Sequence, residues 1–324
     1  MKAHAPLPLW SLIAPIAGWM LLALSLLGLQ GGLWLVLMTA ALIAGVLSAV
    51  HHVIEVALIV SLMLTGGPQT TALARDTVFA AVMLILNGIV GLCLLVGGSR
   101  YREQTFGLLG VSASLATLAA IAILTLVLPN YTTSVPGPVY SPSQLAFVAV
   151  VSLVLYGTFV LVQTVRHRDY FLPLDAHEDH EAHAQPPSNR LAAASAALLL
   201  LSLGAVVLLA KSLAPAIELA VASAGAPKAV VGIIIAMVVL LPEGLALALG
   251  SALASIGLTI PAVAMVSLAT GWTLTLGLDI KSTVLLLLSL FISTLSLGTG
   301  RTTVLQGVVH LVVLATYLFT TIVP

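Results

Sequence analysis

The stretch Asp76-Thr-Val-Phe-Ala-Ala-Val-Met-Leu-Ile-Leu-Asn87-Gly-Ile-Val-Gly-Leu-Cys-Leu-Leu-Val-Gly97-Gly98-Ser99-Arg100 decides the fold class of this chain of 324 residues. It begins with an aspartate, ends with an arginine and carries no charge between them. Residues 79–97 are long enough to cross a hydrocarbon core about 30 Å thick as an α-helix. A helix also satisfies its own backbone hydrogen bonds in lipid. We therefore predict a transmembrane helix here, with the polar Asn87 near its middle.

Composition extends this interpretation to the whole chain. Hydrophobic residues make up 60% of it and charged residues only 7%, whereas soluble domains carry about 25% charged residues. The mean hydropathy is +1.19. Alternating strands of about ten residues are absent, which favours helices over a barrel. The sequence thus predicts an all-α, polytopic membrane protein whose partner is the lipid bilayer, and its formal net charge of zero argues against a nucleic-acid partner.

We expect about eleven transmembrane helices, each formed by one apolar run. The runs cover residues 10–29, 33–50, 53–66, 79–97, 107–128, 144–165, 191–211, 229–247, 250–270, 282–297 and 303–322. The third run is too short, because about fourteen residues rising about 1.5 Å each do not cross about 30 Å. By domain, we expect a first helix within 1–30, a first repeat in 31–165, a cytoplasmic linker in 166–190 and a second repeat in 191–324.

The linker is rich in acids and histidines between residues 175 and 183. It either gathers cations at the cytoplasmic mouth and changes charge near pH ~6, or is a solvated loop. Basic residues in short loops set the orientation of a membrane protein. With the N-terminus in the cytoplasm, the cytoplasmic side holds seven of them and the outer side four, namely Arg75, Lys211, Lys228 and Lys281. Eleven spans then place the C-terminus outside.

Two segments resemble each other across the halves. Asp76 to Arg100 and Asp279 to Arg301 both start with an aspartate, cross an apolar run and end in a glycine pair and an arginine. We interpret them as copies from two five-helix repeats that are inverted in the membrane, as in many transporters. Asn87 and Ser289 then fall at equivalent depths.

Two acids, Glu55 and Glu243, lie within or beside apolar runs, one in each half. A carboxylate at the centre of a transmembrane helix costs about 2.5–3.5 kcal/mol, so it is retained there mainly for function. A desolvated carboxylate exchanges protons near physiological pH and also binds hard cations. The pair therefore predicts a site for a cation and protons in alternation. The alternative is a position at a helix end near water, which Pro242 favours for Glu243.

Neutral oxygens near these acids would complete the coordination of a cation. Asn87, Ser251, Ser255 and Ser289 are candidate secondary ligands, with interhelical packing as the alternative. A different class of function, a membrane-embedded metalloenzyme, would use His51, His52 and Glu55. Adjacent histidines point to different faces of a helix, which argues against it. His310, deep in the last run, is either hydrogen-bonded within the bundle or a proton relay.

Several motifs, taken together, resemble the calcium/cation–proton exchanger family, and specifically its bacterial ChaA-like branch. They are Val-Ile-Glu55-Val-Ala-Leu-Ile-Val-Ser-Leu-Met-Leu-Thr-Gly, Arg75-Asp76-Thr, Ala-Ile-Glu218-Leu-Ala, Leu-Pro242-Glu243-Gly244, Gly250-Ser251-Ala-Leu-Ala-Ser255-Ile-Gly-Leu-Thr-Ile-Pro261 and Gly300-Arg301-Thr-Thr-Val-Leu-Gln-Gly.

The resemblance implies ten helices in two inverted repeats after one extra helix, and it implies that Glu55 and Glu243 are the acids of the two signature repeats. It also implies exchange of cytoplasmic Ca²⁺, and also of Na⁺ or K⁺, for external H⁺ across a bacterial inner membrane. These ions are substrates, and no cofactor is expected. The oligomeric state stays open, with a homo-oligomer as one possibility.

The sequence departs from the family pattern at two equivalent places. It lacks the loop and half-span before the first signature acid, where His52 leads directly to Val53, and the polar loop between Glu243 and Gly250. We therefore expect residues to be missing at both places, with breaks in the chain longer than the usual spacing of about 3.8 Å between consecutive Cα atoms.

Overall fold

The computed structural model describes residues 51–167, 223, 233 and 248–323. The expected spans at 10–29, 33–50, 191–211 and 229–247, residues 168–190 of the linker, and Glu243 lie outside the described residues. The proposed domain boundaries at 30, 190 and 191 lie outside them as well.

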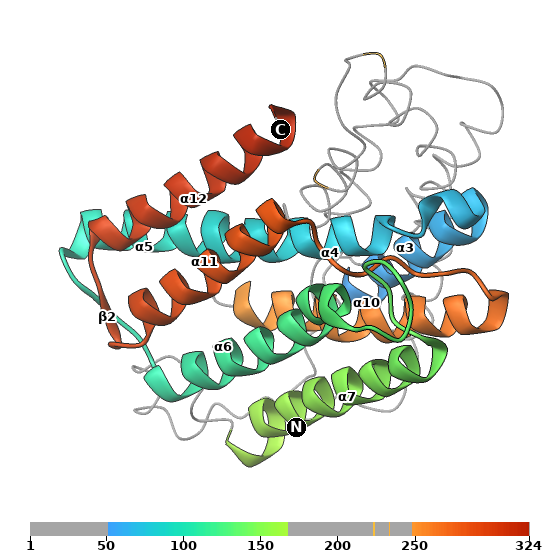
Figure 1. Ribbon diagram of the computed structural model, residues 1–324. Helices are drawn as coiled ribbons and strands as arrows, with labels where there is room; N and C mark the ends of the chain where they lie inside the picture. The colour runs from blue at the N-terminus through green and yellow to red at the C-terminus, as the bar shows by residue number, and fades with distance from the viewer. Residues whose placement is uncertain (1–50, 168–222, 224–232, 234–247, 324) are drawn as a thin grey trace, which may run out of the picture.

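The regular elements of the described chain are helices, apart from one small pair of strands (Figure 1). Its first part contains α3 (His51–Gly66), the 3₁₀ turn η1 (Gly67–Thr70), α4 (Leu73–Met83), η2 (Leu84–Ile89), α5 (Val90–Tyr101), α6 (Leu108–Ala122), η3 (Ile123–Val127), η4 (Leu128–Tyr131), α7 (Pro142–Leu161) and η5 (Val162–Arg166). Its second part contains α10 (Ala248–Thr270), α11 (Ile280–Leu297) and α12 (Val304–Ile322). The strands are β1 (Gln104–Thr105) and β2 (Arg301–Thr302).

Six helices in the described residues are long and apolar enough to cross a membrane. They run over Leu73–Tyr101, Leu108–Tyr131, Pro142–Arg166, Leu249–Thr270, Ile280–Leu297 and Val304–Ile322. Each coincides with an expected span, so the polytopic helical fold predicted from the apolar runs is confirmed. α3 has 16 residues, in keeping with the short third run.

α3 is one continuous helix across His52 and Val53. The expected gap in the chain is therefore not seen at this point, and the loss of a segment there stays a prediction. The second expected break, between Glu243 and Gly250, begins outside the described residues.

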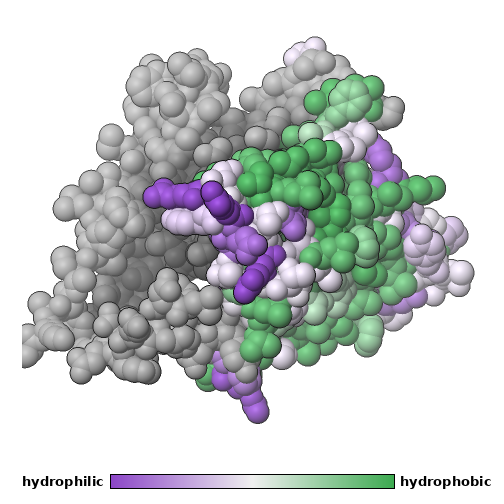
Figure 2. Space-filling view, turned by 90° about the vertical axis from the view of Figure 1, so that its left-hand side faces the viewer, coloured by the Kyte–Doolittle hydropathy of each residue, from purple (hydrophilic) through white to green (hydrophobic). Residues whose placement is uncertain are grey.

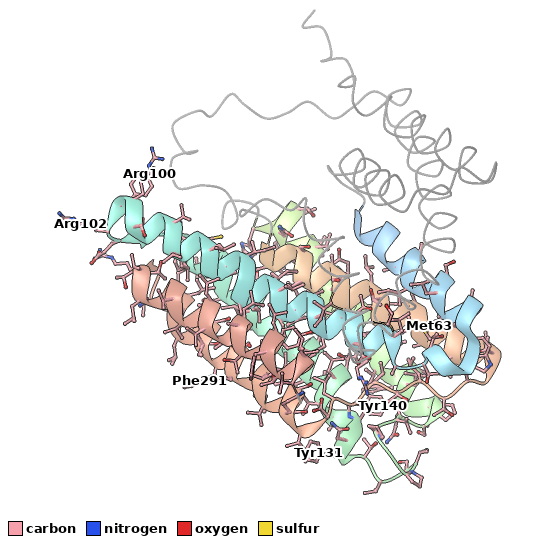
Figure 3. All side chains as sticks on the ribbon, turned by 90° about the horizontal axis from the view of Figure 1, so that it is seen from above. Met63, Arg100, Arg102, Tyr131, Tyr140 and Phe291 are labelled. Carbon is pink, nitrogen blue, oxygen red and sulfur yellow. The ribbon has the colours of Figure 1, made fainter. Side chains whose placement is uncertain are left out.

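Contacts between distant segments define the two ends of the bundle. At the first, which we call the aspartate end, the Asn130 side-chain amide donates to the Leu278 carbonyl at 2.6 Å and the Lys281 ammonium donates to the Thr320 carbonyl at 2.6 Å. At the other, the arginine end, β1 pairs antiparallel with β2, with Gln104 opposite Thr302. Figure 3 shows Arg100 and Arg102 projecting from the arginine end and Tyr131 and Tyr140 at the opposite end.

These ends reveal two inverted units. Three helices start at the aspartate end, namely 73–101, α7 and α11. Three others end there: α10 beside the start of 73–101, α6 beside the start of α11, and α12 beside the start of α7. Each helix of 73–166 is thus antiparallel to its counterpart in 248–322. Packing repeats the relation, because α12 packs mainly on α5 and α7 mainly on α10. Inverted repeats are therefore confirmed for this part of the chain.

The sequence match that suggested the inversion, however, paired the wrong helices. The segments 76–100 and 279–301 both run from the aspartate end to the arginine end, so they are parallel. The reason is topological: these are the fourth and tenth expected spans, and helices separated by an even number of crossings point the same way. The inverted counterpart of 73–101 is α10, and that of α11 is α6.

The helix 73–101 and α10 form the centre of the bundle. In their most apolar stretches, 72% and 67% of the chain is buried, whereas the value is 28% for α7 and for α12, which lie on the outside. Large hydrophobic side chains on α7, α11 and α12 are exposed, among them Phe147, Phe291 and Phe319 at 68%, 61% and 63%. Such a surface is stable in lipid and not in water. Figure 2, which looks onto the arginine end, shows hydrophilic side chains gathered beside this broad hydrophobic surface.

Glycines let α5 and α12 approach closely. A Cβ at Gly307 on α12 would collide with the backbone nitrogen of Leu95 and lie 2.9 Å from the carbonyl oxygen of Gly91. A Cβ at Gly98 would lie 2.6 Å from the backbone nitrogen of Val304. Backbone cannot move aside as a side-chain tip can, so these positions fix the α5–α12 spacing.

We expect Gly307→Ala to lower the thermal unfolding temperature in detergent by several degrees. Overpacking costs about 1–3 kcal/mol, and each kcal/mol is worth about 2–4 °C in a chain of this size. The matched control is Gly157→Ala in the middle of α7, where a Cβ would meet no described atom within 4 Å. Equal unfolding temperatures for the two variants would contradict the close packing.

Candidate cation site

Asn87 and Ser289 meet in the centre of the bundle. The Asn87 side-chain amide donates to the Ser289 hydroxyl oxygen at 2.8 Å, and the hydroxyl donates to the Leu285 carbonyl at 2.7 Å. Both side chains are fully buried. The equal depth predicted for this pair is confirmed, and their role as ligands stays a prediction. Their hydrogen bond joins the central helix 73–101 to α11.

Asn87 lies in a widened turn of the helix. η2 is a π-helical segment between α4 and α5, and π turns inside α-helices are frequent at functional sites. The Asn87 amide nitrogen is bonded, but its oxygen Oδ1 is buried without a hydrogen-bond partner among the described residues. An unpaired amide oxygen in a membrane interior is costly, and it is also a good ligand for a hard cation.

A second row of buried oxygens lies on α10. Ser251 and Ser255 are buried and one turn apart, and Thr259 continues the same face another turn on. The Thr259 hydroxyl has no hydrogen-bond partner among the described residues. Sequence reasoning missed Thr259, although its spacing of four from Ser255 was a signal. α10 packs against α3, α4 and η2, so this row belongs to the layer that contains Asn87.

The two acids are placed only in part. Glu55 is in α3, a helix that packs on α10, but its side chain is not among those described. Glu243 lies outside the described residues, so the predicted approach of Glu243 to Glu55 stays a prediction. The described structure brings together Asn87 and Ser289 and places Ser251 and Ser255 on a neighbouring helix.

Polar contacts at the aspartate end form a separate cluster that sequence reasoning also missed. Arg75 and Asp76 form an ion pair at 2.7 Å, and a second nitrogen of Arg75 donates to the Gly277 carbonyl at 3.2 Å. Tyr140 donates to the Leu124 carbonyl at 2.5 Å, and burial raises the pKa of Tyr140 to about 12, so it stays a neutral donor. The Arg75 contact holds the start of α4 against the α10–α11 connection, and the Tyr140 contact holds the loop before α7 against η3.

Comparison with known proteins identifies the family. The sequence profile of the sodium/calcium exchanger protein family matches residues 9–165. The ionic transporter y4hA of Sinorhizobium fredii is 46% identical over 360 residues, covering 99% of this chain and 98% of the relative. The sodium-potassium/proton antiporter ChaA of Escherichia coli is 33% identical over 292 residues, covering 85% of this chain and 79% of ChaA.

The chain belongs to the sodium/calcium exchanger family. Its fold agrees with solved members. Native YfkE superposes with a TM-score of 0.70 at 15% identity, covering 97% of this chain and 100% of YfkE. The H⁺/Ca²⁺ exchanger CAX superposes with a TM-score of 0.62 at 11% identity, covering 95% of this chain and 88% of that one. The resemblance to the cation–proton exchangers is thus confirmed.

Membership in this exchanger family makes the protein a multi-pass membrane antiporter of cations and not an enzyme. The metalloenzyme alternative built on His51, His52 and Glu55 is therefore wrong.

The length of one alignment bears on the missing segments. The alignment with y4hA is 360 positions long, and 99% of the 324 residues of this chain take part in it. About 39 positions of the alignment therefore have a residue of y4hA and none of this chain. This agrees with the inference that the sequence lacks internal segments, here relative to y4hA.

Proposed function

We propose that this exchanger carries Ca²⁺ out of the cytoplasm in exchange for H⁺, and that Na⁺ and K⁺ are further substrates. Glu55 and Glu243 bind the cation and protons in alternation, because a carboxyl group cannot hold both at once. The carboxyl groups then lie close together near the bilayer midplane, within the roughly 5 Å that two Ca²⁺–oxygen bonds span.

The observation that supports this best is the unpartnered Oδ1 of Asn87. It lies fully buried in a π turn of the central helix, held by the hydrogen bond to Ser289. Ca²⁺ takes six to eight oxygens, of which carboxylates supply only some. We assign the uncharged oxygen ligands to Asn87 and to the hydroxyls of Ser251, Ser255 and Ser289. Thr259, on the same face of α10 as the first two serines, joins this set.

The related proteins differ in the cation for which they are named. ChaA is named for sodium and potassium, and the solved structures YfkE and CAX are named for calcium. Two acids with several neutral oxygens suit a divalent ion with charge neutrality. We therefore place Ca²⁺ first and the monovalent ions second.

Orientation follows from charge at the two ends. Arg100, Arg102, Arg166 and Arg301 lie at the arginine end, whereas the aspartate end of the described chain holds Arg75, which is paired with Asp76, and Lys281. Cytoplasmic loops carry the excess of basic residues. We propose that the arginine end faces the cytoplasm of a bacterial inner membrane, with the N-terminus inside and the C-terminus outside.

The direct test is transport by purified protein in proteoliposomes that hold a proton gradient, acid inside, reported by a quenched pH dye. Addition of Ca²⁺, Na⁺ or K⁺ outside should dissipate the gradient, with Ca²⁺ effective at the lowest concentration. Dissipation by Na⁺ and K⁺ alone would retain the antiporter and reassign its substrate. No dissipation by any of the three would overturn the proposal.

A further inference from the structure

His310 is a fully buried titratable side chain in the middle of α12 that the proposed site does not use. Its Cβ would lie 2.9 Å from a Cβ at Gly91 on α5, so α5 accommodates it by carrying a glycine there. Its ring lies beside the Leu86 carbonyl, with which one ring N–H makes only a poorly aligned contact. Leu86 belongs to the same π turn as Asn87.

His310 is level with the Asn87–Ser289 pair in the membrane. α11 and α12 are antiparallel, and Lys281 reaches Thr320 at one end while Leu297 is followed closely by Val304 at the other. This register sets His310 opposite Phe291, only two residues from Ser289, or about 3 Å along the axis. Contacts with Gly91 and Leu86 give the same level on the central helix.

Neither imidazole nitrogen makes a well-aligned hydrogen bond among the described residues, and the Leu86 carbonyl lies beside the ring. A neutral imidazole normally donates from one nitrogen and accepts at the other, so the nitrogen that faces away from Leu86 has no donor to accept from in the described chain. A ring nitrogen of His310 is therefore available to accept a proton beside the candidate cation site. Histidine is the side chain whose charge changes most readily near neutral pH.

Other titratable groups near α12 are engaged or distant. Tyr317 lies two turns further along α12 and faces Asp76 and Phe79. On the elements packed against α12, Cys93 donates to its own helix at the Ile89 carbonyl, and Lys281 is at the far end. Arg100 and Tyr101 are exposed at the arginine end. Within the described chain, His310 thus faces no charged side chain.

We propose that His310 is an additional proton-binding group of the transport cycle, protonated when the cation site is empty and neutral when it is filled. The inference rests on the proposed cation–proton exchange and deepens it. The imidazole accepts one proton at a ring nitrogen as the cation leaves, and the imidazolium releases that proton when the next cation binds. A positive charge at the level of the site repels a cation, so the two states exclude each other.

The consequence is a count of protons. Each cation that binds displaces protons from the carboxyl groups and one more from His310. The slope of the logarithm of the cation dissociation constant against pH reports this number. We expect His310→Gln to reduce the slope by about one proton per cation at the acidic end of the pH range in which Ca²⁺ binding is measured, while binding at high pH is retained.

The measurement is Ca²⁺ binding to the purified, detergent-solubilised protein by calorimetry in buffers of different ionisation enthalpy, across this pH range. His167→Gln is the matched control, because His167 lies at the end of η5 on another helix. His310→Asn serves as a second variant, and monodisperse elution shows that each is folded. An unchanged proton count in either folded variant overturns the inference. No Ca²⁺ binding by the wild-type protein, tested also with Na⁺ and K⁺, would instead count against the proposed function.

Discussion

Glu243→Gln is expected to abolish cation–proton exchange and to leave the protein folded. Glutamine keeps the shape of glutamate but neither carries a charge nor exchanges a proton. Removing one charge from a desolvated ionic site costs about 3–5 kcal/mol, which corresponds to a loss of transport of about 100-fold or more. The same loss is expected for Glu55→Gln, because one ion requires both carboxylates.

The measurement is dissipation of a proton gradient by Ca²⁺ in proteoliposomes with equal amounts of each variant. Glu103→Gln provides the matched control: its carboxylate is exposed at the arginine end, 3.9 Å from Arg301, and the variant should transport as wild type does. Normal exchange by Glu243→Gln would show that Glu243 does not couple the two ions. A loss of both transport and monodisperse elution would indicate a folding defect and call for Glu243→Asp.

Apolar run length was sufficient to locate helices, because a lipid core sets a minimum length and excludes irregular backbone. The runs 79–97 and 282–297 fall within helices Leu73–Tyr101 and Ile280–Leu297. Length says nothing of direction, and here the sequence led to an error. The likeness between the segments beginning at Asp76 and Asp279 suggests inversion, although the two helices are parallel.

The candidate site was predictable in its chemistry and not in its geometry. Asn87 and Ser289 stand out as polar residues in apolar runs, and their depth follows from counting residues. The π turn at Asn87 packs against α10, α11 and α12, and the sequence of a single helix does not encode these contacts. The surroundings of the His310 ring are likewise a property of several packed helices. Thr259 was overlooked because threonine is common in helix interfaces.

Asn87→Leu is expected to raise the Ca²⁺ concentration for half-maximal transport by about tenfold or more. Leucine has nearly the same volume but supplies no oxygen, so the cation loses one ligand. A hydrogen bond to a charged group is worth about 1.5–3 kcal/mol, and we use the same magnitude for the lost contact between the amide oxygen and the cation. Every 1.4 kcal/mol is about a factor of ten in affinity. Ser289 keeps its own hydrogen bond to the Leu285 carbonyl, so the variant leaves no donor unpaired.

Thr125→Val separates this effect from a general response to altered buried polarity. Thr125 is fully buried in η3, another π turn, and its hydroxyl donates to the Ile121 carbonyl of its own helix at 2.7 Å. Valine there should leave the Ca²⁺ dependence of transport unchanged. If Asn87→Leu and Thr125→Val shift the half-maximal concentration equally, the Asn87 oxygen is not a ligand. If only Asn87→Leu shifts it, and the maximal rate at saturating Ca²⁺ is retained, the lost contribution is to cation binding, as expected for a buried oxygen that has no hydrogen-bond partner among the described residues.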